Sequence, residues 1–110
     1  MIFIKSPSEI DKIRASCRII GELLDALGSK VVPGVSTLEL DAFAEDFILS
    51  RGGRPAFKGY TVPGLKPFPG TLCTSLNSGI VHGIPSREAV LREGDIIGID
   101  VGVVKDGYYG

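Results

Sequence analysis

Apolar residues in the first quarter of the chain recur with the period of a helix. Ser6-Pro7-Ser8-Glu9 combines an N-cap serine, a proline at the first helical position and a glutamate at the third, which predicts a helix that begins at Pro7. Apolar residues then follow at steps of three and four, and Gly28 is the expected end. The predicted apolar stripe consists of Ile10, Ile13, Cys17, Ile20, Leu24 and Leu27.

A second helix is expected after the turn at Pro33-Gly34. Ser36 and Glu39 repeat the capping pattern, and Gly52-Gly53 is expected to close the helix. Its apolar face is Leu40, Phe43, Ala44, Phe47 and Ile48. We interpret the acidic residues of both helices as solvated positions and caps, and these are Glu9, Asp11, Glu22, Asp25, Glu39, Asp41, Glu45 and Asp46.

The second half of the chain reads as a loop followed by strands. Residues 54–70 hold four prolines and three glycines, which predicts an irregular loop. Apolar and β-branched runs then predict strands over 71–76 and 95–104 and a short segment at 80–81, and Asp106-Gly107 predicts a hairpin. We therefore expect a single α+β domain over 1–110, with both helices on one face of an antiparallel sheet.

One carboxylate occupies an unusual place in the strand predicted over 95–104. Alternation puts the isoleucines and valines on one face and Asp100 on the other, between Gly98 and Gly102. Burying an acid that has no side chain on either side is costly unless a metal ion or an arginine fills the space. The alternative is an edge strand whose polar face meets water.

Two other features leave both a functional and a structural interpretation open. His82, the only histidine, lies in the glycine-rich segment from Asn77 to Pro85, where it is either a structural residue or a ligand or proton-transfer group. Three loop aromatics either line an apolar pocket or cap the core, and these are Phe57, Tyr60 and Phe68.

Composition narrows the class of protein. A chain of 110 residues with 44% hydrophobic and 23% charged residues fits one soluble globular domain. A net charge of −1 without a basic stripe argues against nucleic acid and membrane as partners. Because there is no membrane-length or signal-like apolar run, and Cys17 and Cys73 read as free thiols, we expect a cytoplasmic location. No GxGxxG, Walker or HExxH motif is present.

Several segments in order resemble type I methionine aminopeptidases. They are IKSPSEIDKIRASCRI, VPGVSTLEL, PAFKGY, LCTSLNSGIVHGIP and LREGDIIGIDVGVVKDGYYG, and the VHGIP and IDVG pieces are the most specific. The resemblance implies half of the pita-bread fold, in which two pseudo-symmetric α+β halves surround a dinuclear metal centre. It also implies an enzyme that removes the initiator methionine from nascent polypeptides.

Residue roles follow from the resemblance position by position. Asp100 matches a metal-ligating aspartate, and His82 matches a catalytic histidine that hydrogen-bonds the scissile amide region. Asn77 and Gly79 match positions whose oxygens hold a monovalent cation. The positions that match the methionine pocket are Phe57, Tyr60, Phe68 and Cys73. The resemblance implies two divalent ions, and oxygen-rich ligands suit Co, Mn, Fe or Zn.

Two departures from the family pattern affect the functional prediction. The family places a second aspartate directly after GYYG, and a histidine and two glutamates later, whereas this sequence offers only Asp100 among those ligands. We therefore expect the 110-residue chain alone to be inactive or very weak as an aminopeptidase. In addition, residues 61–67 look like an insertion beside the substrate pocket.

A different class of function stays open. A stand-alone half of the pita-bread fold would expose a sheet edge, which a second copy would cover in a homodimer that binds or supports other molecules without peptidase activity. Creatinase-like and proliferation-associated relatives share this architecture with other functions, although the VHGIP and IDVG segments favour the aminopeptidases.

Overall fold

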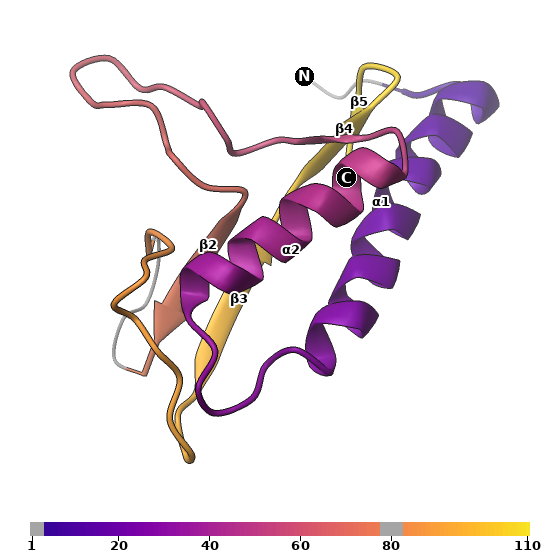
Figure 1. Cartoon of the computed structure of the whole chain (residues 1–110). Helices are drawn as coiled ribbons and strands as arrows, with labels where there is room; N and C mark the ends of the chain where they lie inside the picture. Colours follow the sequence, from indigo (N-terminus) through magenta and orange to yellow (C-terminus); the bar gives the residue numbers. More distant parts are fainter. Residues whose placement is uncertain (1–3, 78–82) are drawn as a thin grey trace.

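Two helices lie across a layer of antiparallel strands (Figure 1). The computed structural model describes residues 4–77 and 83–110, so the predicted segment at 80–81 lies outside the described residues. Helix α1 covers Pro7–Gly28 and helix α2 covers Thr37–Ser50. The strands are β1 (Arg54–Pro55), β2 (Leu72–Leu76), β3 (Ile97–Val101), β4 (Val103–Lys105) and β5 (Tyr108–Tyr109).

Both helices begin at the predicted serine caps. The Ser6 hydroxyl accepts a hydrogen bond from the Glu9 N–H at 3.2 Å, and the Glu9 carboxylate accepts one from the Ser6 N–H at 3.0 Å. The Ser36 hydroxyl accepts from the Glu39 N–H at 3.1 Å. Gly52, with φ of 78°, follows the end of α2 in the left-handed conformation that glycine adopts without strain. These contacts satisfy amides that have no partner inside the helix.

The buried face of α1 differs from the predicted stripe. The structure buries Ser16, Ile19, Leu23 and Leu27, whereas Ile10 and Leu24 of the predicted stripe are 44% and 45% exposed. The β4–β5 hairpin explains the difference, because the Ser16 hydroxyl donates to the Tyr108 carbonyl at 2.7 Å. A Cβ on Gly110 would lie only 3.0 Å from that of Ser16. Because Ser16 and Gly110 are small, α1 and the hairpin can approach closely, and this contact turns the Ser16 face of α1 towards the core.

The apolar face predicted for α2 is confirmed. Leu40, Ala44 and Ile48 are buried, and Phe43 and Phe47 pack at the edge of the core. These residues share one core with the buried residues of α1 and with Leu72, Leu91 and Val103. Neither helix in the described part of the chain is long and apolar enough to span a bilayer.

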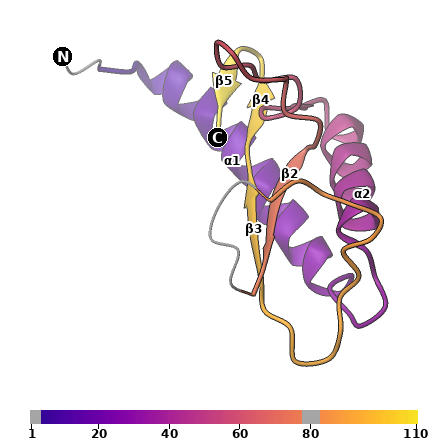
Figure 2. The same cartoon turned by 90° about the vertical axis from the view of Figure 1, so that its left-hand side faces the viewer.

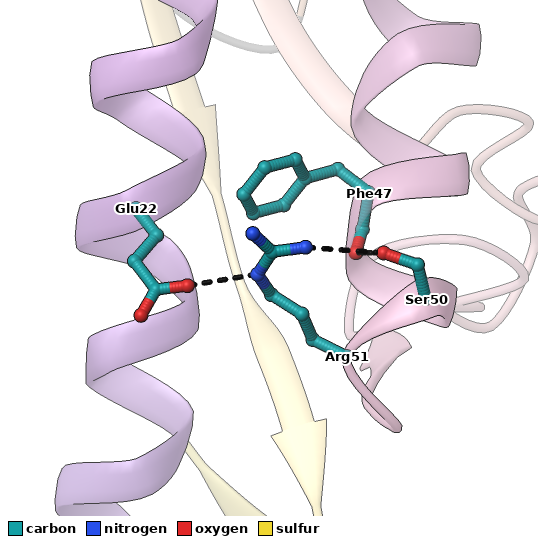
Figure 3. A network of polar contacts seen from close by, with 4 residues as sticks. All are labelled: Glu22, Phe47, Ser50 and Arg51. Carbon is teal, nitrogen blue, oxygen red and sulfur yellow. Dashed lines mark hydrogen bonds and ion pairs between the residues drawn. The ribbon is translucent and has the colours of Figure 1, made fainter.

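Arg51 ties the end of α2 to α1 (Figure 3). Its guanidinium carbon lies 3.8 Å from the centre of the Phe47 ring, and its Nε donates to the Glu22 carboxylate at 2.8 Å. A second nitrogen lies 3.3 Å from the Ser50 hydroxyl, which itself donates to the Phe47 carbonyl. The pairing of an arginine with a ring and a carboxylate joins the two helices at the surface.

The single strand predicted over 95–104 is divided at Gly102. In Figure 2, β3 and β4 follow one another along one line with β2 beside β3. However, β3 pairs only with β2, and β4 belongs to a second sheet with the order β1-β4-β5. The incoming loop crosses at the division, since the Ala56 N–H donates to the Gly102 carbonyl at 2.9 Å.

The hairpin between β4 and β5 is confirmed. Lys105 pairs with Tyr108, and Asp106 and Gly107 between them have φ of 52° and 82°. Two central residues with positive φ match the tight turn whose twist suits antiparallel strands.

Candidate functional site

Asp100 lies on the exposed face of β3, as the alternation predicted. Ile97, Ile99 and Val101 are partly buried, whereas Gly98 and Asp100 are exposed. Among residues 4–77 and 83–110, no ion pair includes Asp100 and no side chain donates a hydrogen bond to it, so the arginine alternative finds no support there. In the same part of the chain, β3 has a partner strand on one side only and its polar face is exposed, as the edge-strand alternative predicted.

The two glycines that flank Asp100 have different surroundings. A Cβ on Gly102 would lie 3.0 Å from the Ala56 Cβ and 3.2 Å from the Phe57 ring. The nearest atom to a Cβ on Gly98 is the Ser75 carbonyl oxygen at 3.8 Å. The Phe57 ring therefore closes the space beside Asp100 at the Gly102 end, whereas no residue within 4–77 or 83–110 fills the space at the Gly98 end.

Cys73 stands directly opposite Asp100 in the β2–β3 pair. The register joins Cys73 to Asp100, and opposite residues of an antiparallel pair point to the same face. Burial raises the pKa of the Cys73 thiol, and the negative charges of Asp100 and Asp41 raise it further. Near neutral pH this side chain is therefore a protonated, soft thiol beside a carboxylate.

The predicted pocket residues fall into two groups. Phe57 and Cys73 lie beside Asp100, as described above. Tyr60, which is 65% exposed, and the partly buried Phe68 form the base of an arm that projects from the body of the molecule (Figure 1). The Gly59 N–H donates to the Phe68 carbonyl at 2.8 Å and the Phe68 N–H donates to the Tyr60 carbonyl at 2.9 Å. The predicted insertion, residues 61–67, is the tip of this arm.

Asn77 directly follows β2 and is hydrogen-bonded to the segment before β3. Its side-chain oxygen accepts from the Ile96 N–H at 3.0 Å, and its amide nitrogen donates to Asp95 at 3.2 Å. Hydrogen bonds from the Arg92 backbone and from Asn77 lower the pKa of Asp95. The side chain of Asn77 therefore has a structural partner, which leaves its main-chain oxygen for the predicted cation. Gly79 and His82 lie outside the described residues.

The segment that follows His82 returns to β2. The Thr74 N–H donates to the Gly83 carbonyl at 2.9 Å. A Cβ on Gly83 would overlap the Thr74 carbonyl, so only glycine allows this approach. The structure therefore places the residue next to His82 on the edge of β2 that lies away from β3.

One predicted surface carboxylate is buried. Asp41 is 6% exposed and accepts hydrogen bonds from the Thr71 and Leu72 N–H groups, both at 2.7 Å. The interpretation of Asp41 as a solvated residue was wrong, because its carboxylate supplies partners for buried amides at the start of β2. Burial raises its pKa, and the two amide donors oppose that shift. A sequence signal existed, since positions 37, 41, 44 and 48 also follow the helical repeat.

Asp100 and its neighbours could form one part of a metal site, but not a complete one. The described ranges contain no group of three or more His, Cys, Asp or Glu side chains that could hold a metal ion. Asp100 has an exposed carboxylate, with Gly98 and Gly102 on either side and a thiol opposite. This arrangement fits a single oxygen ligand for a divalent ion.

Comparisons with known proteins identify the family to which this sequence is similar. The sequence profile of metallopeptidase family M24 matches residues 11–110. The chain is 53% identical over 109 residues to methionine aminopeptidase of Helicobacter pylori and 46% identical over 110 residues to that of Clostridium acetobutylicum. The match to the Helicobacter pylori protein includes 99% of this chain but only 41% of that relative. The match to the Clostridium acetobutylicum protein includes 100% of this chain but only 42% of that relative.

Solved structures agree in fold. The structure matches methionine aminopeptidase from Rickettsia prowazekii with a TM-score of 0.91 and 39% identity, and the enzyme from Thermotoga maritima with 0.92 and 35%. Each match covers 100% of this chain and 42% of the solved chain. The predicted fold class, α+β with part of the pita-bread architecture, is confirmed. The chain therefore belongs to metallopeptidase family M24.

Proposed function

We propose that this chain supplies part of the active site of a type I methionine aminopeptidase, which removes the initiator methionine from nascent polypeptides. The observation that carries the proposal is the Asp100–Cys73 pair, with Phe57 closing one side and Gly98 leaving the other open. The names of the relatives support the substrate, and the cytoplasm, where nascent chains are made, is the proposed location.

Asp100 is the proposed metal ligand. Two divalent ions, Co, Mn, Fe or Zn, would supply an acidified water and polarise the substrate carbonyl when bound. Asp100 offers its carboxylate from the open Gly98 side. Asn77 and Gly79 are proposed to hold a monovalent cation through main-chain oxygens.

The remaining residues are proposed to bind and orient the substrate. The protonated thiol of Cys73 and the Phe57 ring suit a methionine thioether, because a thioether packs well against ring edges and a free thiol behaves as a small apolar group. Tyr60 and Phe68 would extend this pocket from the base of the arm. His82 is proposed to donate a hydrogen bond to the oxygen on which negative charge develops.

The first test separates metal binding from turnover. Mn²⁺ added to the ¹⁵N-labelled chain should broaden the amide signals of residues 73, 98 and 100, and Asp100→Asn should abolish the effect. Broadening that is unchanged in Asp100→Asn would contradict Asp100 as a ligand. Because the described residues offer one carboxylate for the site, we expect little methionine release from Met-Ala-Ser with Co or Mn, and any release should disappear in Asp100→Ala.

A homodimer without peptidase activity is the second candidate. Among the described residues, the edge of β3 that faces away from β2 has no partner strand, and Ile96 beside it is 75% exposed. An open edge of this kind pairs readily with a second copy. Analytical ultracentrifugation should show a dimer at micromolar concentration, and a monomer throughout would exclude this candidate.

A further inference from the structure

Helix α2 carries two polar residues on its buried face, one helical turn apart. Thr37 is 1% exposed and Asp41 is 6% exposed. The Thr37 hydroxyl accepts from the Ser86 N–H at 2.8 Å and lies 3.1 Å from the Ser86 carbonyl, to which it donates. Asp41 accepts from two amides at the start of β2 through a single oxygen. Each residue thus binds main chain of another segment and not a side chain.

These two segments are the ends of one stretch of chain that borders the candidate site. Asp41 binds Thr71 and Leu72, and the next residue is Cys73. Thr37 binds Ser86, which lies three residues after Gly83, the residue that contacts the edge of β2. We refer to the described parts of this stretch, residues 71–77 and 83–86, as the site segment.

The two ends of the site segment also meet each other. A Cβ on Gly70 would lie 3.1 Å from the Asp41 carboxylate oxygen and 3.0 Å from Pro85. Both distances are shorter than ordinary carbon contacts, so the absence of a side chain at Gly70 allows the three parts to approach. Asp41, the entry to β2 and the exit at Pro85 therefore form one junction.

Core packing does not explain polar residues at these positions. A buried carboxylate is costly, and here burial already raises the pKa of Asp41. Apolar residues at 37 and 41 would extend the face of Leu40, Ala44 and Ile48. The polar atoms instead hold backbone groups at defined points of the strand. Because a shift of one residue in a strand turns every side chain to the other face, such points set which residue stands opposite Asp100.

We propose that Thr37 and Asp41 are positioning residues of the candidate site, which hold the two ends of the site segment so that Cys73 faces Asp100. This inference rests on the proposed function for the importance of the Cys73–Asp100 pair. Its test does not depend on peptidase activity, so the two proposals can fail separately.

The experiment measures the Cys73–Asp100 arrangement through a disulfide. In a Cys17→Ser background, Asp100→Cys introduces a thiol opposite Cys73, where antiparallel neighbours lie within the reach of a disulfide. Oxidised and reduced glutathione set the equilibrium, and two protein thiols are oxidised as one glutathione disulfide is reduced to two thiols. The equilibrium constant of this exchange gives the effective concentration of one protein thiol at the other, which rises as the two residues are held face to face. Gly98→Cys, two residues along the same face, is the geometric control.

Matched substitutions separate the hydrogen bonds from the shape of each residue. Asp41→Leu removes the acceptor oxygen and Thr37→Val removes the hydroxyl. Asp41→Asn keeps an acceptor oxygen, and Thr37→Ser keeps the hydroxyl. The first pair should lower the effective concentration by about tenfold, and the second should leave it within about twofold, since only the first loses the buried hydrogen bonds. Protected amides at Ala44 and Ile48 show that α2 remains folded.

Two results would overturn the proposal. One is an unchanged effective concentration in Asp41→Leu and Thr37→Val chains whose α2 amides are protected. The other needs no substitution at α2 and applies even if those variants do not fold. If the Thr71, Leu72 and Ser86 amides of the unmodified chain exchange as fast as in a free peptide while Ala44 is protected, α2 does not hold the site segment.

Discussion

Each helix begins with a serine that accepts a hydrogen bond from the N–H of a glutamate three residues later, but the buried polar residues of the two helices bind different segments. The buried face of α1 contains Ser16, Ile19, Leu23 and Leu27 and packs mainly on β4 and β5. The buried face of α2 includes Thr37 and Asp41, whose polar atoms bind the backbone of other segments. We conclude that α1 builds the core and binds the β4–β5 hairpin through Ser16, whereas α2 builds the core and holds the strand that carries Cys73.

One carboxylate on each helix shows the same contrast. Hydrogen bonds from the Ser6 backbone and then from the Tyr108 hydroxyl lower the pKa of the half-buried Glu9. Burial raises the pKa of Asp41. The surroundings decide the direction of the pKa shift, because hydrogen-bond donors stabilise the charged form whereas an apolar interior penalises it.

The largest expected effect tests α1 as the core-building helix. Leu23→Ala removes a side chain with 0% exposure and should lower the free energy of unfolding by about 2–5 kcal/mol. Leu24→Ala, at a position 45% exposed, is the matched control and should change it by less than about 1 kcal/mol. Urea unfolding followed by circular dichroism measures both, and equal losses would show that the burial described for α1 is wrong.

A smaller effect tests the strand segment that α2 holds. Gly83→Ala places a Cβ against the Thr74 carbonyl, so the backbone has to move, at an expected cost of about 1–3 kcal/mol. Among the described residues, a Cβ at Gly98 meets nothing closer than 3.8 Å, so Gly98→Ala should not destabilise the chain. Thermal unfolding of both variants measures this. A Gly83→Ala chain as stable as the original would mean that Gly83 does not pack on β2.

A still smaller effect tests the link between the helices. Arg51→Ala removes the contact with Phe47 and the ion pair with Glu22, both at the surface, and should cost less than about 1 kcal/mol. Part of the loss should disappear at 1 M salt, because salt screens the ion pair. Arg14→Ala, whose partner Asp11 lies on the same helix, is the control and should cost less still.

The smallest effects concern pH, and the two helices should respond with opposite signs. A lowered pKa means that Glu9 contributes stability above its ordinary value of 4.5 and loses it as pH falls through the folded-state value. Glu9→Gln should therefore be less stable than the original chain at pH 7. A raised pKa means that Asp41 favours folding below its ordinary value of 3.8 and loses that contribution as pH rises through the folded-state value.

Asp41→Asn should consequently equal or exceed the original chain in stability at pH 7. Both differences should close on acidification, and urea unfolding between pH 7 and pH 3 measures them. A loss of stability at pH 7 in Asp41→Asn would show that the charge of Asp41, and not its oxygen, holds the strand.

Local patterns predicted much of the fold because each depends on neighbours in sequence. The caps at Ser6 and Ser36, the ends of both helices, the hairpin at Asp106-Gly107 and the exposed face of Asp100 all follow from backbone geometry or strand alternation. Other features required distant segments. The division at Gly102 depends on where residues 56 and 57 cross, and the face of α1 depends on the hairpin at Ser16.

The sequence by itself determined both helices, the hairpin at Asp106-Gly107, the α+β class and the protein family, because these depend on local spacing and motifs. Only the tertiary structure decided that Phe57 closes one side of Asp100 and that Asp41 is buried. The physical reason is that a polar side chain is stable inside a protein only where partners for its hydrogen bonds arrive. For Asp41 those partners are amides 30 and 31 residues away along the chain.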